Sequence, residues 1–159
     1  MKQLIRKILR EQEEEIITLP PFSFFGYDWN EVLEYADDRL FRVNDDIDLS
    51  STEIKTLGGL VEVGGNLNLF NCINLKTLDK LRSVDGWLNL WDCKNLQSLG
   101  ELRSVGGYLD LLSCENLQSL GKLEYVGGSL DITYTYIPEK MTDDEIRNQI
   151  DIKGRIISE

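Results

Sequence analysis

Three cysteines are the residues of this chain best suited to chemistry, because a thiolate can attack a substrate or bind a metal ion. Cys72, Cys93 and Cys114 follow one another at intervals of 21 residues. This spacing is not that of a zinc site, and parallel side chains on neighbouring repeats are badly oriented for a disulfide. We therefore expect a column of buried thiols and a protein that resides in a reducing compartment.

The remaining side chains offer little to a catalytic mechanism. The chain has no histidine, which is the commonest general base and the commonest transition-metal ligand. Asp45, Asp46 and Asp48 do not follow the spacing of a calcium-binding loop, and the glycine pairs of the chain lack the lysine of a phosphate-binding loop. The sequence thus predicts no catalytic residues, no metal site and no cofactor, and it indicates a protein that is not an enzyme.

The elements that carry these residues recur with the same period. The aligned copies read LVEVGGNLNLFNCINLKTLDK (60–80), LRSVDGWLNLWDCKNLQSLGE (81–101), LRSVGGYLDLLSCENLQSLGK (102–122) and LEYVGGSLDITYTYIPEK (123–140). Irregular copies are visible before and after them, over 40–57 and 150–157. A period in this range is typical of solenoid proteins, in which successive repeats stack and bury a continuous core.

Each copy has seven apolar positions, which in the second copy are Leu81, Val84, Leu88, Leu90, Cys93, Leu96 and Leu99. The L-x-L part alternates as a strand does, so we expect each copy to add one short strand to a parallel sheet. Before that strand stands a glycine at 65, 86, 107 and 128. We expect a corner there with a positive φ, which glycine adopts without steric cost.

The segments LNLWDCKNL (88–96) and LDLLSCENL (109–117) resemble the leucine-rich repeat signature, and V-G-G-x-L-x-L resembles the short coils of receptor L domains. The resemblance covers roughly residues 40–157. It implies binding and scaffold roles and no single reaction. The opening of the chain also resembles the starts of small proteins encoded by tailed bacteriophages, which would make a host protein the partner.

We predict a mainly β fold, a short right-handed parallel β-solenoid of leucine-rich-repeat type with small helical caps at both ends. A triangular solenoid and a horseshoe both remain open, because the repeat is short and lacks an obvious helical segment. The predicted parts are a helical leader and cap over 1–39, the solenoid repeats over 40–138, and a capping helix with a final strand over 139–159.

Three segments outside the repeats have helical patterns. Residues 2–17 are amphipathic, which suits either a leader packed on the first coil or a helix that binds a membrane surface or a partner. Asp28 and Glu31 form a D-x-x-E capping pattern that predicts a helix from 29 to about 38. Thr142 and Glu145 form a T-x-x-E capping box that predicts a short helix before the last strand.

The net charge of −11 disfavours direct binding to nucleic acid or to an anionic membrane, because both require lysine and arginine to neutralise phosphates. No stretch is long enough to span a bilayer, and the opening residues lack the apolar core of a secretory signal. We therefore expect a soluble cytoplasmic protein, in a bacterial or a host cell.

The outward positions of the strands are the candidate functional site. If Leu88 and Leu90 point inward, then the residues on either side of them point outward, and the same holds in the neighbouring copies. We name the outward apolar set the aromatic strand face; it consists of Phe70, Trp87, Trp91, Tyr108 and Leu112. A polar row runs through its middle, Asn68, Asn89, Asp110 and Asp131.

Exposed aromatic residues on an acidic surface are typical of protein interfaces. We therefore predict a non-enzymatic module that binds another protein through Phe70, Trp87, Asn89, Trp91, Tyr108, Asp110, Leu112 and Asp131. A homodimer or another self-associating structural protein is an alternative, as is coverage of the rings by residues 21–29. A further alternative is an acidic mimic of nucleic acid that inhibits a DNA-binding protein, and the paired tryptophans also suit a sugar-stacking site.

Overall fold

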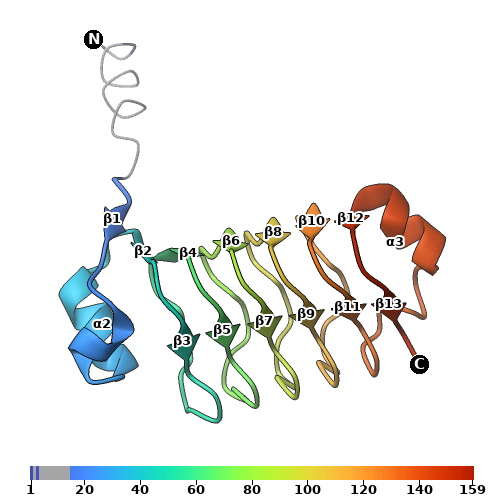
Figure 1. Cartoon of the computed structure of the whole chain (residues 1–159), viewed down its shortest axis with the longest axis horizontal. Helices are drawn as coiled ribbons and strands as arrows, with labels where there is room; N and C mark the ends of the chain where they lie inside the picture. The colour runs from blue at the N-terminus through green and yellow to red at the C-terminus, as the bar shows by residue number, and fades with distance from the viewer. Residues whose placement is uncertain (2, 4–14) are drawn as a thin grey trace.

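The computed structural model describes residues 1, 3 and 15–159, and this part of the chain is mainly β. Two parallel sheets run along the molecule, one of seven strands and one of six (Figure 1). The first contains β1 (Ile17–Thr18), β2 (Phe41–Val43), β4 (Leu60–Val63), β6 (Ser83–Val84), β8 (Ser104–Val105), β10 (Tyr125–Val126) and β12 (Asp151–Ile152), in this order. The second contains β3 (Ile47–Asp48), β5 (Leu67–Asn68), β7 (Leu88–Asn89), β9 (Leu109–Asp110), β11 (Leu130–Asp131) and β13 (Ile156–Ile157).

Each repeat therefore supplies two strands, one to each sheet, and the prediction of a single strand per repeat was wrong. The predicted L-x-L strand is the one in the six-stranded sheet. The additional strand, exemplified by Ser83–Val84, precedes the glycine corner. Only one of its two residues is apolar, so it has no alternating pattern that the sequence could reveal.

The strands pair without any shift between one regular repeat and the next. Leu67 lies opposite Leu88, Leu88 opposite Leu109, and Leu109 opposite Leu130. The Leu88 amide, for example, donates to the Tyr108 carbonyl oxygen at 3.0 Å. Equivalent residues therefore form columns along the molecule, which is what brings outward side chains of neighbouring repeats into contact.

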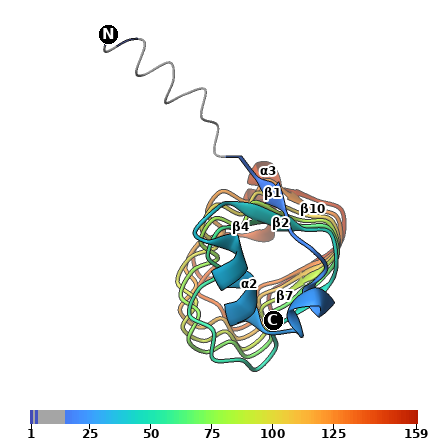
Figure 2. The same cartoon turned by 90° about the vertical axis from the view of Figure 1, so that its left-hand side faces the viewer.

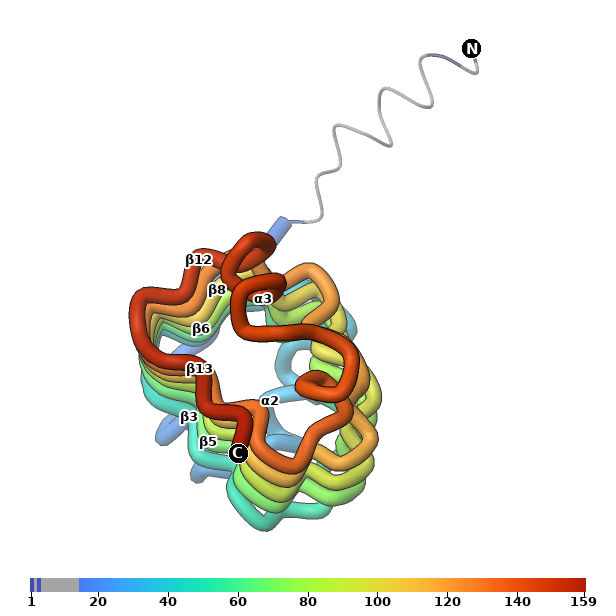
Figure 3. The backbone as a smooth tube through the Cα atoms, turned by 90° about the vertical axis from the view of Figure 1, so that its right-hand side faces the viewer, coloured from blue at the N-terminus to red at the C-terminus, as the bar shows by residue number. Residues whose placement is uncertain are grey.

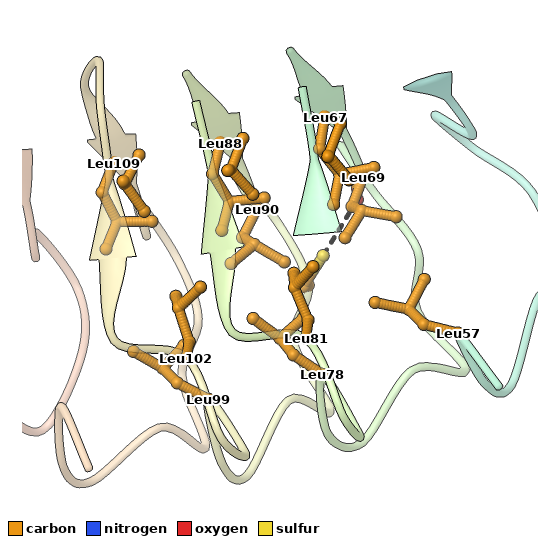
Figure 4. Packing of buried hydrophobic residues seen from close by; sticks show 14 of the residues in the cluster. Leu57, Leu67, Leu69, Leu78, Leu81, Leu88, Leu90, Leu99, Leu102 and Leu109 are labelled. Carbon is orange, nitrogen blue, oxygen red and sulfur yellow. Dashed lines mark hydrogen bonds between the residues drawn. The ribbon is translucent and has the colours of Figure 1, made fainter. Parts of the chain in front are cut away.

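The columns of inward leucines fill the space between the two sheets (Figure 4). All seven apolar positions of the repeat 81–101 are buried, with no more than 1% of any side chain exposed. Burying one leucine side chain contributes about 2 kcal/mol, so the repeats stabilise one another mainly through this core. The stacked outlines of the repeats can be followed from either end in Figures 2 and 3.

The glycines before the L-x-L strand serve a different purpose from the one predicted. None of Gly65, Gly86, Gly107 and Gly128 has a positive φ. Their backbones instead approach the preceding repeat, and a β-carbon on Gly128 would lie 2.8 Å from the Tyr108 nitrogen and 3.0 Å from the Gly107 carbonyl carbon. The glycine column is thus required because neighbouring backbones approach too closely there for a side chain.

Helices cover the two ends of the stack (Figures 1 and 2). The 3₁₀ helix η1 (Phe22–Phe25) and helix α2 (Trp29–Ala36) lie beside the first repeat, and the Asp28 side chain caps α2 by accepting a hydrogen bond from the Asn30 amide at 2.8 Å. This confirms the predicted helix, although it ends two residues earlier, at Ala36.

Helix α3 (Asp143–Gln149) covers the other end, beside β12. Thr142 and Glu145 form the predicted capping box, and Ile146 is buried in the core. The helix predicted over residues 2–17 falls mostly outside the described residues, and its last residue, Ile17, belongs instead to β1 and pairs with Phe41. Within the described chain, neither α2 nor α3 has the length and apolarity needed to cross a membrane.

Candidate protein-interaction face

The outer surface of the six-stranded sheet carries the residues predicted from the sequence. Leu88 and Leu90 are buried, while Trp87, Asn89 and Trp91 reach the surface, as the strand alternation requires. Trp91 is 44% exposed and Tyr108 is 43% exposed, and the remaining members of the aromatic strand face are partly buried. The structure therefore brings this set together on one surface, as β5, β7 and β9 lie side by side.

The rings of the aromatic strand face form two pairs, each between neighbouring repeats. Trp87 and Tyr108 are stacked, with ring centroids 5.7 Å apart and ring planes inclined by 9°. Phe70 and Trp91 meet at 5.2 Å with a tilt of 58°. Since each ring already packs against another, these side chains lose less conformational entropy on binding than isolated surface rings would.

The polar row between the ring pairs has a structural role that the sequence analysis missed. One side-chain oxygen of each residue in the row accepts a hydrogen bond from the backbone amide two residues further along the chain. The bonds run from Phe70 N to Asn68 (3.2 Å), from Trp91 N to Asn89 (2.9 Å), from Leu112 N to Asp110 (3.0 Å) and from Thr133 N to Asp131 (2.9 Å). These bonds turn the chain at the end of each strand and leave the second oxygen of each aspartate for other contacts.

Asp110 has a perturbed environment within this row. Burial raises the pKa of its carboxyl group, the hydrogen bond from the Leu112 amide opposes that effect, and the neighbouring Asp131 raises the pKa further. None of the ion pairs within residues 15–159 involves either carboxylate. A positive charge placed between Asp110 and Asp131 would therefore relieve a repulsion that this part of the chain leaves uncompensated.

Residues 21–29 do not cover the aromatic strand face, so that alternative was wrong. Phe22 packs against Trp29, with ring centroids 6.1 Å apart, and Trp29 packs against Phe41 at the same distance. The Trp29 indole also donates to the Thr56 carbonyl oxygen at 3.1 Å. These contacts hold the segment at the end of the stack, beside the first repeats.

The three cysteines are buried and unpaired, as predicted. Each thiol donates to a leucine carbonyl oxygen of the preceding repeat: Cys72 to Leu49 (3.1 Å), Cys93 to Leu69 (3.0 Å) and Cys114 to Leu90 (3.1 Å). Burial raises the pKa of the Cys93 thiol to about 12, so it remains protonated and unreactive at neutral pH. Within the described residues no group of three histidine, cysteine, aspartate or glutamate side chains could hold a metal ion.

The structure also shows an exposed aromatic group that the sequence analysis did not select. Tyr134 is 73% exposed and Tyr136 is 46% exposed, and both line a hollow of about 380 Å³ with Glu115 and Glu139. The available signal was the departure of TYTY (133–136) from the L-S-C-E of the repeat before it. Tyr134 and Tyr136 follow the strand β11, where the alternation of the strand no longer predicts which side chains point outward.

In comparisons with known proteins, no family model, curated protein or solved structure matches the chain. The assignment of a function therefore depends on the geometry of the aromatic strand face.

Proposed function

We propose that this protein is a non-enzymatic interaction module that binds another protein through the aromatic strand face. In this proposal the stacked parallel strands form a short right-handed β-solenoid of leucine-rich type, which acts as a rigid support. The single observation that carries the proposal is the pair of half-exposed rings, Trp91 and Tyr108, each packed against a ring of the neighbouring repeat on one regular sheet.

Three physical arguments support a protein partner. Tryptophan and tyrosine are the side chains that most often dominate binding energy when a partner covers them. The ring pairs are held in place before binding, which lowers the entropic cost of association. The turns that follow the strands are fixed by the hydrogen bonds of the polar row, which hold the backbone of Trp91 and of Phe70 in place.

The polar row argues against the alternative that this protein mimics nucleic acid. A mimic needs rows of carboxylates that imitate phosphates. With Asp48, which pairs with Asn68 at its first end, this row reads Asp48, Asn68, Asn89, Asp110 and Asp131, so two amides interrupt the carboxylates. Each of its side chains also uses one oxygen to hold the backbone. For these reasons we favour recognition by the rings over imitation of a charged backbone.

The test uses the tagged full-length chain to capture proteins from cells of the organism that encodes it, followed by titration of each purified candidate. Trp91→Ala should weaken binding by about 2 kcal/mol, or roughly thirtyfold, if this ring is a central anchor. Tyr35→Ala is the matched control, because Tyr35 is 51% exposed and lies on α2, at the end of the stack. Equal affinity of the wild-type protein and the Trp91 variant would refute the proposal.

Two further measurements distinguish the proposal from its alternatives. Light scattering that shows a dimer for the wild-type protein and a monomer for Trp91→Ala would reassign the face to self-association. A complex that weakens steeply with salt and competes with DNA would instead support the mimic, because that mode depends on charge.

A further inference from the structure

The aromatic strand face contains a slot beside Tyr108. Ser129 occupies the position next to Tyr108 in the following repeat, because Leu109 and Leu130 are paired. One face of the Tyr108 ring is stacked on Trp87, and the other side adjoins the column position where only the small Ser129 side chain stands. A hollow of about 370 Å³ lies there, lined by Tyr108, Leu109, Asp110, Ser129, Asp131 and Ile157.

The walls of this slot differ in chemistry. Tyr108, which is 43% exposed, offers a flat aromatic ring. Asp110 and Asp131 stand side by side in paired strands, and each has one oxygen engaged by a backbone amide and one oxygen without a hydrogen-bond partner in residues 15–159. Burial and mutual repulsion already disfavour the charge on Asp110. Arg155 occupies the position beside Ser129 in the next repeat, but no ion pair within residues 15–159 joins it to Asp110 or Asp131. The slot thus combines an open ring face with two carboxylates that make no ion pair.

We propose that the slot binds the guanidinium group of an arginine side chain from the partner protein, and this inference rests on the proposed function. A guanidinium group is planar, so it can stack on the Tyr108 ring in the place that the serine leaves open. Its N–H groups point outward in the same plane, where they can donate to the free oxygens of Asp110 and Asp131. The stack of rings would then continue from Trp87 through Tyr108 to the arginine of the partner.

The chemistry favours arginine over lysine in this slot. A lysine ammonium group would satisfy the carboxylates but is compact and strongly hydrated, so it gains less from the ring. An aromatic side chain would fill the space but would leave the two carboxylates without a counterion. The partner should therefore present an exposed arginine, flanked by apolar residues that contact the remaining rings.

The test needs no knowledge of the partner. The full-length protein, labelled with ¹⁵N, is titrated with N-acetyl-arginine amide while the backbone amide signals are followed by NMR. The signals of Tyr108, Ser129 and Asp131 should shift in a saturable manner. Nα-acetyl-citrulline amide, which is neutral but has nearly the same shape, should cause no such shift. Nα-acetyl-lysine amide, which keeps its ε-ammonium group, should bind several-fold more weakly than the arginine compound.

Variants locate the binding. Asp131→Asn should weaken binding of the arginine amide roughly fivefold while keeping the acceptor for the Thr133 amide. Ser129→Tyr should abolish it by filling the slot with a ring that continues the stack. Asp48→Asn is the matched control, because Asp48 holds the Ser50 amide in the same way but lies at the far end of the row.

The proposal is overturned if the arginine amide causes no saturable shift, if the citrulline or lysine compound binds equally well, or if Asp48→Asn has the same effect as Asp131→Asn. These outcomes are distinguishable from failure of the proposed function. If the protein binds the arginine amide but Trp91→Ala leaves its affinity for the partner protein unchanged, the slot is supported and the proposed role of the aromatic strand face is refuted.

Discussion

At the scale of the residue, Asp110 shows that a side chain can hold the fold together and still carry an unfavourable charge. Its oxygen fixes the Leu112 amide at 3.0 Å, while burial and the neighbouring Asp131 raise the pKa of its carboxyl group above the ordinary value of 3.8. Asn89 occupies the same position one repeat earlier and holds the Trp91 amide without a charge. An asparagine side chain can therefore make the same hydrogen bond in this column without adding a charge.

We predict that Asp110→Asn increases the free energy of unfolding by about 0.5 kcal/mol at pH 7, because it keeps the hydrogen bond and removes a like-charge neighbour. A raised carboxyl pKa means that the native state holds its proton more tightly than the unfolded state does. In the wild-type protein the free-energy cost of the ionised Asp110 therefore decreases as the pH falls toward that pKa, because the carboxyl group becomes protonated. The difference between the two proteins should disappear on acidification, as measured by urea unfolding at a series of pH values.

Asp48→Asn provides the control of opposite sign. Hydrogen bonds, first of all that with the Ser50 side chain, lower the pKa of Asp48 despite its partial burial, so its charge is favoured in the native state. This variant should lose stability at pH 7, and the loss should fade as the pH falls below the ordinary pKa. A gain of stability in both variants would show that net charge, and not the local environment of Asp110, sets the outcome.

At the scale of the element, the glycine column sets how closely successive repeats can approach. The Gly128 amide donates to the Gly107 carbonyl oxygen at 2.9 Å, and a β-carbon on Gly128 would meet the backbone of Tyr108 at 2.8 Å. We predict that Gly128→Ala costs about 3 kcal/mol, because backbone atoms of two repeats would have to separate.

Gly121→Ala is the comparison for this prediction. Gly121 has a φ of +57° but nothing lies within 4 Å of a β-carbon there, so alanine should cost only the left-handed conformation, about 1 kcal/mol. Thermal and urea unfolding of the two variants measure the difference. Equal costs would mean that backbone conformation, and not the approach of the repeats, explains the glycine column.

The same elements show how far the sequence could predict the fold. The strands at Leu67, Leu88 and Leu109 were predictable because their alternation is local, and the caps were predictable because Asp28 and Thr142 stand before apolar helical patterns. Strands such as Ser83–Val84 were not, since only the valine is apolar and no alternating pattern of apolar residues marks them. The aromatic strand face followed from alternation alone, whereas the slot beside Tyr108 depends on ring geometry that a sequence does not contain.

At the scale of the whole molecule, the unshifted pairing of the repeats makes one of them removable. Residues 60–80, 81–101 and 102–122 place equivalent residues in the same columns, so a chain without 81–101 can pair Leu67 directly with Leu109. The core of a stacked repeat protein consists of contacts between neighbours, and one fewer repeat removes one such interface. The shortened chain should fold, with lower stability.

Deletion of 81–101 therefore tests both the architecture and the separation of the two binding features. The urea dependence of the unfolding free energy should fall by about 13%, the share of 21 residues in 159, because it follows the surface exposed on unfolding. Loss of Trp87 and Trp91 should abolish capture of the protein partner, whereas Tyr108, Asp110, Ser129 and Asp131 remain and should still bind the arginine amide. Deletion of 81–91, which removes about half a repeat and shifts every later residue out of its column, should unfold the protein. If circular dichroism instead shows the two deletions to be equally folded, the columns of in-register side chains cannot be what specifies this structure.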